Sequence, residues 1–473
     1  MEIFDTGIPD LVNTIARAGG TPILVGGAVR DFLMAGKTHP FEGDTDFNTT
    51  DYDIECFGLT LPQLQDALDG HGFNWDEVGE HFSVLKVRVR GLGHPIDLSI
   101  PRYEKSTGSG HREFEVMTDP NLTFAEAAKR RDFCMNSMGF DMLTGTLLDP
   151  WTGRFDIENN IISYIDGSFA DDPLRPLRAA RFAARFTMDI SDGTMELCRE
   201  MRPLAVSLPA ERIWGEIKKA VHECINLGDF FWWIARMGWV DLLPEVSFLM
   251  DVPQDPNWHP EGDVLMHTCH ALNYWSQNLR TGNKEDDFIT AIAVLCHDFG
   301  KATTTEHVDG RFRARGHEEA GVELTESFLY RLRQYELADE VTPLVANHLA
   351  PVRPFTKKGI RRLSTKVKRM DLLCLVSKAD TAGRPPLDPT GSFPAIEEFE
   401  QAWRDMDIPR GGPQRLLGGD YLISLGMTPG PAFKVILDAV YEQQINGEVT
   451  DVWEAKMCAN RLITDLGLFP LKK

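Results

Sequence analysis

A pair of glycines followed by an arginine and an aspartate constrains this chain more than any other feature. A short apolar run, Ile23-Leu24-Val25, leads directly into Gly26 and Gly27, and a helical pattern resumes from Val29 to Met34. We expect a strand, a tight turn and a helix start, in that order. Glycines let the backbone approach an anion closely, and the N–H groups at a helix start point toward it. This turn, which continues into Arg30, therefore predicts a site for the phosphates of a nucleoside triphosphate.

Two aspartates, Asp51 and Asp53, lie downstream in a segment with the alternation of a half-buried strand. Residues two apart on a strand project from the same face, and two carboxylates on one face repel each other unless a cation lies between them. Mg²⁺ suits such a site because nucleotidyl transfer needs a hard cation. Asp97, inside the apolar run Ile96 to Ile100, is a candidate third carboxylate from an adjacent strand. An unpaired buried aspartate is costly, so we expect Asp97 to face the metals.

Two alternatives compete with this interpretation. Asp-x-Asp pairs are common in surface turns, and Asp44 with Asp46 forms a second pair in the same region. That second pair lies in the polar stretch 39–50, which has little apolar periodicity, so we assign the metal to the later pair.

The overall charge argues at first against a nucleic-acid partner. The 473 residues carry a formal net charge of −22, and nucleic acids bind through local positive charge. Three stretches are basic against this background: 129–131, the series Arg175, Arg178, Arg181 and Arg185, and the cluster 357–369. Solvated surface faces are the simplest interpretation of each, but local density matters more than the sum.

The chain is long enough for about three domains. Strand-like and helical stretches alternate up to about residue 150 and helices dominate afterwards, which predicts an α+β fold. We expect a catalytic head over 1–150, a helical neck over 151–250, a further helical domain over 251–384 and a C-terminal helical segment over 385–473, with 251–262 as a linker. The eight cysteines include no Cys-x-x-Cys, and no leader or membrane span is evident, so we expect a cytoplasmic protein.

Taken together, these motifs resemble the bacterial class of tRNA CCA-adding nucleotidyltransferases and their poly(A) polymerase relatives. The resemblance implies a polymerase-β-like head with a small mixed sheet, and Asp51, Asp53 and Asp97 as the catalytic carboxylates that bind Mg²⁺. The segment 129–136 is similar to the family's Arg-Arg-Asp-Phe-x-x-Asn motif, and 148–153 matches a loop between head and neck. The residues expected around the nucleotide are Gly26, Gly27, Arg30, Arg130, Arg131, Asp132 and Asn136.

The segment Asp171-Asp172-Pro173-Leu174-Arg175 resembles the family's Glu-Asp-x-x-Arg base-reading motif. A carboxylate and a guanidinium one helical turn apart offer acceptors and donors to a Watson–Crick edge. The resemblance therefore implies that Asp172 and Arg175 read cytosine and then adenine, with Arg178 and Arg181 as further candidates on the same helix. Asp171 stands where the family has glutamate, and 39–50 looks inserted relative to the family.

A second candidate site follows the expected linker. His267, His297-Asp298 and Asp380 occur in the order typical of HD-type metal phosphohydrolases. His297 and Asp298 follow the apolar helix expected over 292–296, and Gly300 is positioned to end that helix. His317 and His348 are candidates for a second metal or a phosphate. The surrounding sequences resemble the HD domain fused to some bacterial CCA-adding enzymes, which implies a phosphatase and phosphodiesterase for 2′- or 2′,3′-cyclic phosphate ends.

The leading hypothesis is therefore an enzyme that adds CCA to tRNA from CTP and ATP, with an HD hydrolase that repairs RNA 3′ ends. Two alternatives remain open: a poly(A) polymerase, and an HD phosphohydrolase with a regulatory nucleotide-binding half. The sequence identifies neither the HD metal nor the oligomeric state, which could be a monomer or a homodimer.

Overall fold

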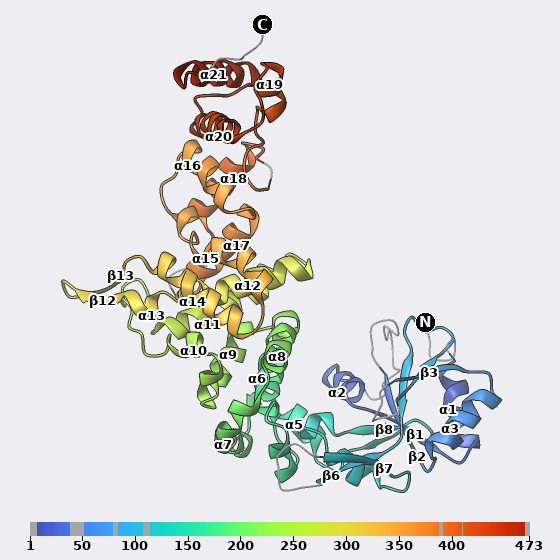
Figure 1. The fold of residues 1–473 in the computed structure, drawn as a ribbon. Helices are drawn as coiled ribbons and strands as arrows, with labels where there is room; N and C mark the ends of the chain where they lie inside the picture. Colours follow the sequence, from blue (N-terminus) through green and yellow to red (C-terminus); the bar gives the residue numbers. More distant parts are fainter. Residues whose placement is uncertain are drawn as a thin grey trace. The chain divides into compact units, whose positions relative to one another are not determined.

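The computed structural model describes residues 7–37, 52–78, 84–106, 114–386, 391–408 and 410–468. The chain forms two compact units (Figure 1). The first comprises Met1–Leu208 with Arg236–Trp239, and the second comprises Pro209–Ala235 with Val240–Lys473. Among the described residues, none of the helices combines the length and the apolar character needed to cross a membrane.

A seven-stranded mixed sheet forms the centre of the first unit. The strand order is β3-β4-β5-β2-β1-β8-β9, in which β2 and β5 run parallel and the other neighbours run antiparallel. The strands are β1 (Thr21–Val25), β2 (Asp53–Phe57), β3 (Asn74–Val78), β4 (Val84–Arg88), β5 (Ile96–Ser99), β8 (Gly139–Asp141) and β9 (Thr146–Leu148). This sheet, followed by a helical remainder, confirms the predicted α+β class.

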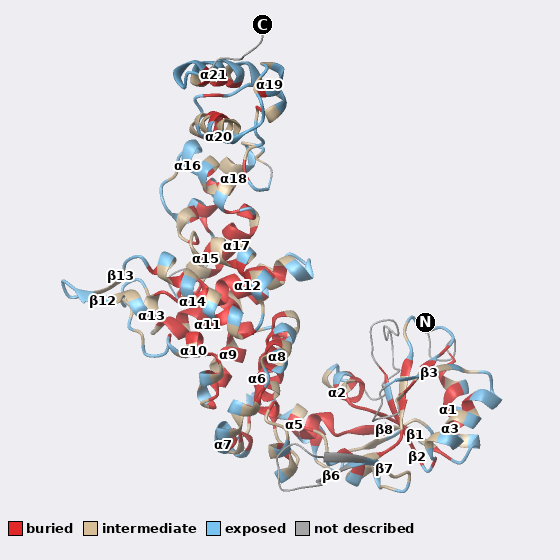
Figure 2. Ribbon diagram, viewed as in Figure 1, coloured by how far each residue is buried: buried red, intermediate tan, exposed pale blue. Residues whose placement is uncertain are grey.

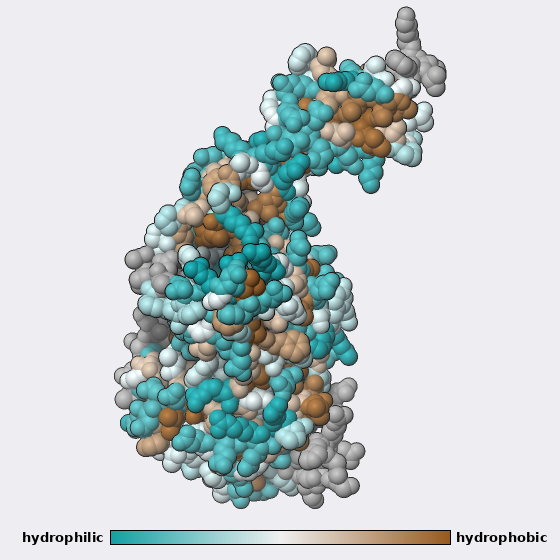
Figure 3. Space-filling view, turned by 90° about the vertical axis from the view of Figure 1, so that its left-hand side faces the viewer, coloured by the Kyte–Doolittle hydropathy of each residue, from teal (hydrophilic) through white to brown (hydrophobic). Residues whose placement is uncertain are grey.

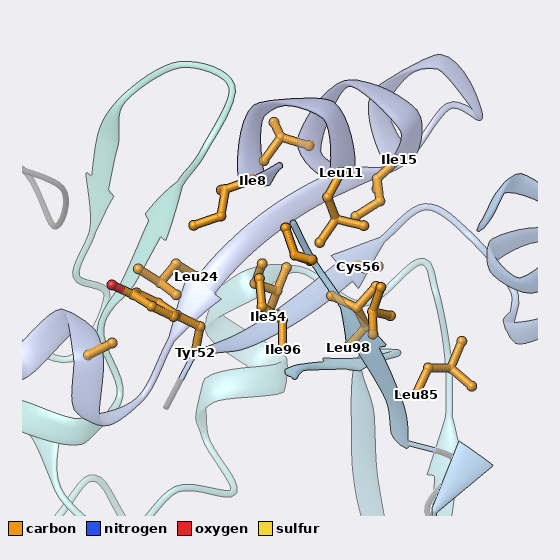
Figure 4. Packing of buried hydrophobic residues seen from close by; sticks show 14 of the residues in the cluster. Ile8, Leu11, Ile15, Leu24, Tyr52, Ile54, Cys56, Leu85, Ile96 and Leu98 are labelled. Atoms are coloured by element: carbon orange, nitrogen blue, oxygen red, sulfur yellow. The ribbon is translucent and has the colours of Figure 1, made fainter. Parts of the chain in front are cut away.

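The two faces of the sheet have different roles. One face packs against α1 (Ile8–Arg17) and α3 (Leu61–Gly70) through side chains such as Ile54 and Leu98, as Figure 4 shows for α1. Alternation along β2 sends Asp53 and Glu55 to the opposite face. The strand-turn-helix prediction is confirmed, because β1 leads through Gly26 into α2 (Gly27–Met34).

The rest of the first unit connects the sheet to a helical region. A hairpin of β6 (Arg102–Ser106) and β7 (Phe114–Thr118) precedes the helical part. The later elements are α4 (Phe124–Ala128), the 3₁₀ turn η2 (Cys134–Asn136), α5 (Gly153–Glu158), β10 (Ile161–Ile162), η3 (Gly167–Asp171), α6 (Arg175–Phe186), β11 (Asp189–Ile190), α7 (Asp192–Glu200) and η4 (Arg202–Ser207). Within α6 Arg175 and Arg181 are buried, so the arginine series is not a solvated surface face.

The second unit is helical apart from one small hairpin. Buried residues concentrate on α11 (Val264–Asn278), α12 (Lys284–Cys296) and α17 (Met370–Ala382), which pack against one another (Figure 2). Its elements are α8 (Ala210–Glu223), α9 (Leu227–Arg236), η5 (Val240–Leu242), α10 (Pro244–Ser247), α11 (Val264–Asn278), α12 (Lys284–Cys296), α13 (Lys301–Thr304), β12 (Thr305–Val308), β13 (Arg311–Ala314), α14 (His317–Arg331), η6 (Tyr335–Leu337), α15 (Ala338–Val345), η7 (Ala350–Val352), α16 (Lys357–Lys366), α17 (Met370–Ala382), α18 (Pro394–Arg404), α19 (Gly419–Ser424), α20 (Pro431–Asn446) and α21 (Val452–Asp465).

The C-terminal helices α19, α20 and α21 share a small apolar core of their own, which includes Leu422, Ile436 and Ala459. They also expose apolar side chains, among them Trp453 and Met457. These helices carry brown, apolar patches in Figure 3.

The expected role of Gly300 in the second unit was wrong. Gly300 does not end α12, which stops at Cys296. Gly300 lies where the backbone of α14 comes close: a Cβ atom at this position would lie 2.0 Å from the carbonyl oxygen of His317. Glycine is therefore required here for close helix packing.

Candidate functional sites

Three polar positions form a row across the sheet of the first unit. Asp53 on β2 lies opposite Asp97 on β5, and Asp97 lies opposite Lys86 on β4. Residues at paired positions project from the same face. The ammonium group of Lys86 lies 2.8 Å and 3.1 Å from the two oxygens of Asp97. The structure thus brings Asp97 beside Asp53, as the sequence suggests, and also gives Asp97 a lysine partner. Asp51, Asp44 and Asp46 lie outside the described residues.

The glycine turn lies at the end of this row. Val25 pairs with Asp53 across β1 and β2, so the next residue, Gly26, is adjacent to that carboxylate. Gly26 has a φ of +76°, and a Cβ atom there would lie 3.6 Å from Oδ2 of Asp53 and 3.5 Å from Nη1 of Arg131. A glycine turn, an acidic group and a guanidinium therefore converge at one edge of the sheet.

Glu55 is a member of this site that the sequence interpretation missed. It lies two residues after Asp53 on the same face, and its carboxylate is buried. Oε1 of Glu55 accepts hydrogen bonds from Nη2 of Arg130 and, at 3.1 Å, from Nη2 of Arg131. Strand alternation after Asp53 was the available signal. Glu55 holds both arginines at the carboxylate edge.

A chain of buried hydrogen bonds links α2 to α6 through the segment 132–136. Nη1 of Arg30 donates to Oδ1 of Asn136 at 2.8 Å, and Nδ2 of Asn136 donates to Oδ1 of Asp132 at 2.9 Å. Nε of Arg178 donates to Oδ2 of Asp132 at 2.8 Å. Burial by itself raises the pKa of Asp132, but the Arg178 charge and these hydrogen bonds outweigh it and lower that pKa. The four residues therefore fix the head against the first neck helix.

The expected base-reading residues lie at the start of α6. Arg175 is buried, and its Nη1 and Nη2 donate to the carbonyl oxygens of Ser168 at 2.7 Å and Arg130 at 2.8 Å. Oδ1 of Asp172 accepts from the backbone N–H of Leu174 at 3.0 Å. Asp171 and Arg181 are the remaining two candidates. Burial raises the pKa of Asp171. Arg181 is buried, and its guanidinium carbon lies 4.3 Å from the centre of the Phe182 ring.

The second unit gathers the HD residues into one buried centre. Nε2 of His267 lies 3.1 Å from Oδ1 of Asp380 and 3.4 Å from Nε2 of His297. These three groups from α11, the end of α12 and α17 offer ligand atoms within 4.8 Å of one another, as a metal ion requires.

Asp298 connects this first set to a second one. Its Oδ2 lies 3.2 Å from Nε2 of His297, and its Oδ1 lies 3.4 Å from Nε2 of His317 and 4.0 Å from Nε2 of His348. His317 and His348 lie 3.3 Å apart through their Nε2 atoms. One carboxylate that faces two adjacent ligand sets is the arrangement of a bridged pair of metal ions.

Three further residues support this centre and were not predicted as site residues. Glu261 accepts from Nδ1 of His267 at 2.8 Å and of His259 at 2.9 Å, and Lys301 lies 2.7 Å from Oδ2 of Asp298. The expected linker 251–262 lies inside the second unit and supplies two of them, His259 and Glu261. Lys301 stands three residues after Asp298, and this spacing was its available signal.

The charges in the centre shift its ionisation. Burial lowers the pKa of His267, but hydrogen bonds with Asp380 and Glu261 outweigh it and raise that pKa to about 9. Burial and the charge of His297 lower the pKa of His348 to about 3. Burial opposes ionisation of Asp298, yet the charges of His297 and Lys301 hold its pKa well below the usual range. Carboxylates that stay charged are suited to bind divalent cations.

Comparison with known protein families agrees with this division. Residues 23–163 match the family described as the Poly A polymerase head domain, and residues 265–376 match the HD domain. The first segment thus matches one domain family and the second segment matches the other. The chain is a nucleotidyltransferase-type protein with a C-terminal HD domain.

Across 98% of its residues the chain has the fold of a CCA-adding enzyme. It is similar to the Bacillus stearothermophilus CCA-adding enzyme in complex with CTP, with 20% identity, 98% of each chain covered and a TM-score of 0.64. A CCA-adding enzyme in complex with ATP matches with 18% identity over 97% of this chain and 92% of that chain, with a TM-score of 0.59. The Thermotoga maritima CCA-adding enzyme complexed with tRNA matches with 17% identity over 96% of this chain and 94% of that chain, with a TM-score of 0.54.

Proposed function

We propose that this protein adds cytidine and adenosine residues to the 3′ end of tRNA, with CTP and ATP as substrates. The observation that carries the proposal is the position of Gly26 next to the carboxylate of Asp53, in a chain whose fold follows that of CCA-adding enzymes almost from end to end. Solved members of that fold bind CTP, ATP and tRNA. A free backbone turn at a carboxylate edge suits a triphosphate with its counterions.

The carboxylates fit Mg²⁺ as the metal of this site. Asp53 and Asp97 project from the same face of adjacent strands, and Asp51 precedes Asp53 by two residues. Mg²⁺ held by these groups would lower the charge barrier between the attacking hydroxyl and the triphosphate. The tRNA 3′ oxygen forms a bond to the α-phosphorus, the bond to the β-phosphate breaks, and pyrophosphate leaves. Gly26, Gly27, Arg130 and Arg131 hold the triphosphate in this scheme.

The neck supplies base selection in this proposal. Asp172 and Arg175 read the Watson–Crick edge of the incoming base, and Arg30, Asp132, Asn136 and Arg178 keep the head and α6 in a fixed relation. The proposal gains support from the order of the elements, because the base readers begin the helix that Asp132 anchors.

We also propose a metal-dependent phosphohydrolase activity in the HD domain. The observation that favours it is Asp298, whose two oxygens face two sets of histidines. A divalent metal held there would activate water. Water adds to phosphorus and the bond to the ribose 2′ oxygen breaks, so a 2′-phosphate end becomes inorganic phosphate and a free hydroxyl.

All eight cysteines are free thiols, which favours the reducing cytoplasm.

The first activity is tested with tRNA that lacks its last three nucleotides. CTP, ATP and both together are supplied with Mg²⁺, and the products are sized. Addition that stops after three nucleotides, and only with both triphosphates, supports CCA addition. Long tails from ATP alone would identify a poly(A) polymerase instead. Asp53→Ala should abolish addition and leave phosphate release intact.

The second activity is tested with RNA that ends in a 2′-phosphate. The wild-type protein with added divalent metal should release inorganic phosphate, and Asp298→Ala should not, while both add nucleotides to tRNA equally well. Phosphate release by Asp298→Ala at the wild-type rate would contradict the assignment.

A further inference from the structure

A pocket of about 290 Å³ opens beside the HD centre. Its walls come from the loop 253–259 and the hairpin of β12 and β13. The lining residues that the argument needs are Trp258, His259, Lys301, Arg311, Phe312 and Arg313. None of the assignments above concerns Trp258 or the hairpin.

Two lining residues connect the pocket to the metal ligands. Lys301 lies 2.7 Å from Oδ2 of Asp298 and also donates to Oε1 of Gln254, a pocket residue, at 2.9 Å. His259 shares the carboxylate of Glu261 with His267, and the two imidazole rings pack edge to face at 4.8 Å. A molecule in the pocket therefore lies next to the candidate hydrolytic centre.

The chemistry of the walls combines positive charge with aromatic rings. Within the described part of the chain, neither Arg311 nor Arg313 forms an ion pair, although the charge of Arg311 acts on the lining carboxylate Asp255. Residue Trp258 is 62% exposed, although tryptophan is highly buried on average. Phe312 adds a second ring from the hairpin. Guanidinium groups bind phosphate and aromatic rings stack on bases.

The size of the pocket limits its occupant. Small-molecule pockets usually enclose about 300–1,000 Å³, so this pocket of about 290 Å³ has the size for one small ligand such as a nucleoside phosphate. We infer that the pocket binds the terminal nucleoside of a phosphorylated RNA 3′ end, with the base against Trp258 and Phe312 and the phosphate between Arg311, Arg313 and Lys301. This inference rests on the proposed hydrolase function and defines its substrate: one base-bearing ribonucleotide, recognised from its end.

The test separates recognition of the base from recognition of the phosphate. Phosphate release is measured with adenosine 2′-monophosphate and with glycerol 2-phosphate, which has no base. Trp258→Ala should raise KM for the nucleotide at least tenfold with little change in kcat, and should not affect glycerol 2-phosphate. Arg311→Gln should raise KM for both. The matched controls are Trp453→Ala and Arg461→Gln. Residue Trp453 is 69% exposed, and the side chain of Arg461 is 85% exposed.

Equal kinetics of Trp258→Ala and Trp453→Ala on the nucleotide would overturn the inference. If the wild-type protein hydrolyses neither of these compounds nor RNA with a 2′-phosphate end, the proposed hydrolase function fails, and calorimetric binding of adenosine 2′-monophosphate still decides about the pocket. Trp258→Ala must then bind at least tenfold more weakly than the wild type, or the pocket is not a nucleoside site. A short RNA with a 2′-phosphate end should compete with the mononucleotide. Failure of the RNA to compete would overturn the assignment to RNA ends and identify a site for free nucleotides.

Discussion

The ammonium group of Lys301 lies 2.7 Å from Oδ2 of Asp298, the oxygen that also faces His267 and His297. Both side chains are largely buried, so the charge of Lys301 is weakly screened. It stabilises the ionised form of the aspartate that connects the two ligand sets.

Loss of this lysine should impair the HD domain alone. Lys301→Met removes the positive charge that keeps Asp298 ionised, and we expect phosphate release from 2′-phosphorylated RNA to fall at least tenfold. Nucleotide addition to tRNA should not change. The exposed Lys434 provides the control Lys434→Met. An unchanged rate of phosphate release in Lys301→Met would show that the ion pair has no role in the hydrolase.

Metal binding to the HD centre should release protons. His267 has a pKa of about 9 in the described structure, so it is protonated at pH 7 and must lose its proton to bind a cation. We expect about one proton to be released from this residue per centre, and affinity to rise with pH up to about pH 9. Titration calorimetry in two buffers of different ionisation enthalpy measures the release. Removal of metal with a chelator should stop phosphate release and spare the fold. Affinity independent of pH between 6 and 8 would contradict this expectation.

Gly26 and Gly27 should differ in their tolerance of alanine. Gly26 has a left-handed φ and faces Asp53, whereas Gly27 is helical and its added Cβ would meet only the end of the Arg30 side chain at 3.4 Å. Gly26→Ala should lower kcat/KM for CTP at least tenfold, since the turn must distort beside the carboxylate. Gly27→Ala is the matched control and should keep most activity. Steady-state kinetics with both variants decides, and equal losses would refute the proposed role of the turn.

The ion pair of Asp132 and Arg178 should hold α6 against the segment 132–136. Nη2 of Arg178 lies 2.5 Å from Oδ2 of Asp132, whose side chain is 9% exposed. Arg178→Met leaves a buried carboxylate unpaired and should lower the free energy of unfolding of the first unit by about 3 kcal/mol. Asp132→Asn with Arg178→Met should lose less than the sum of both single variants. Denaturant unfolding measures the cycle, and strict additivity would mean that the pair is not coupled.

Asp156 should make stability depend on pH. Its carboxylate is buried and accepts from the backbone N–H of Ser163 at 2.8 Å, and burial raises its pKa from 3.8 to about 6. The folded state therefore keeps a proton that the unfolded state loses, so this group's contribution to stability falls as pH rises from about 4 to 6. Asp156→Asn should be about 2–3 kcal/mol more stable than the wild type at pH 8.

The difference between Asp156→Asn and the wild type should shrink as pH falls toward 5. Unfolding midpoints at pH 5, 6 and 8 measure it, and Asp189→Asn at an exposed position is the control. A constant difference across this range would show that Asp156 does not titrate as the structure implies.

The short elements that carry both sites could be predicted from the sequence, because each depends on a local pattern of apolar, polar and glycine residues. An apolar run followed by Gly26 and Gly27 gave the strand, the turn and α2. Alternation after Asp53 was the signal that could have placed Glu55 on the same face, but the sequence interpretation did not include Glu55. The order of His267, His297-Asp298 and Asp380 predicted a metal centre, and the structure brings the ligand atoms of His267, His297 and Asp380 within 4.8 Å of one another. The boundaries at 150, 250 and 384 remain predictions.

The partners of these groups were decided by tertiary structure. His267 and Asp380 are 113 residues apart in sequence and meet only because α11 packs against α17. Lys86 pairs with Asp97 because the register of β4 and β5 places them opposite each other. Glu55 accepts hydrogen bonds from Arg130 and Arg131 because the turn after α4 comes close to β2. Periodicity reports which face a residue occupies, but it contains no information about which distant segment covers that face. The sequence therefore indicated which side chains form the candidate sites, whereas the fold decided which of them lie together.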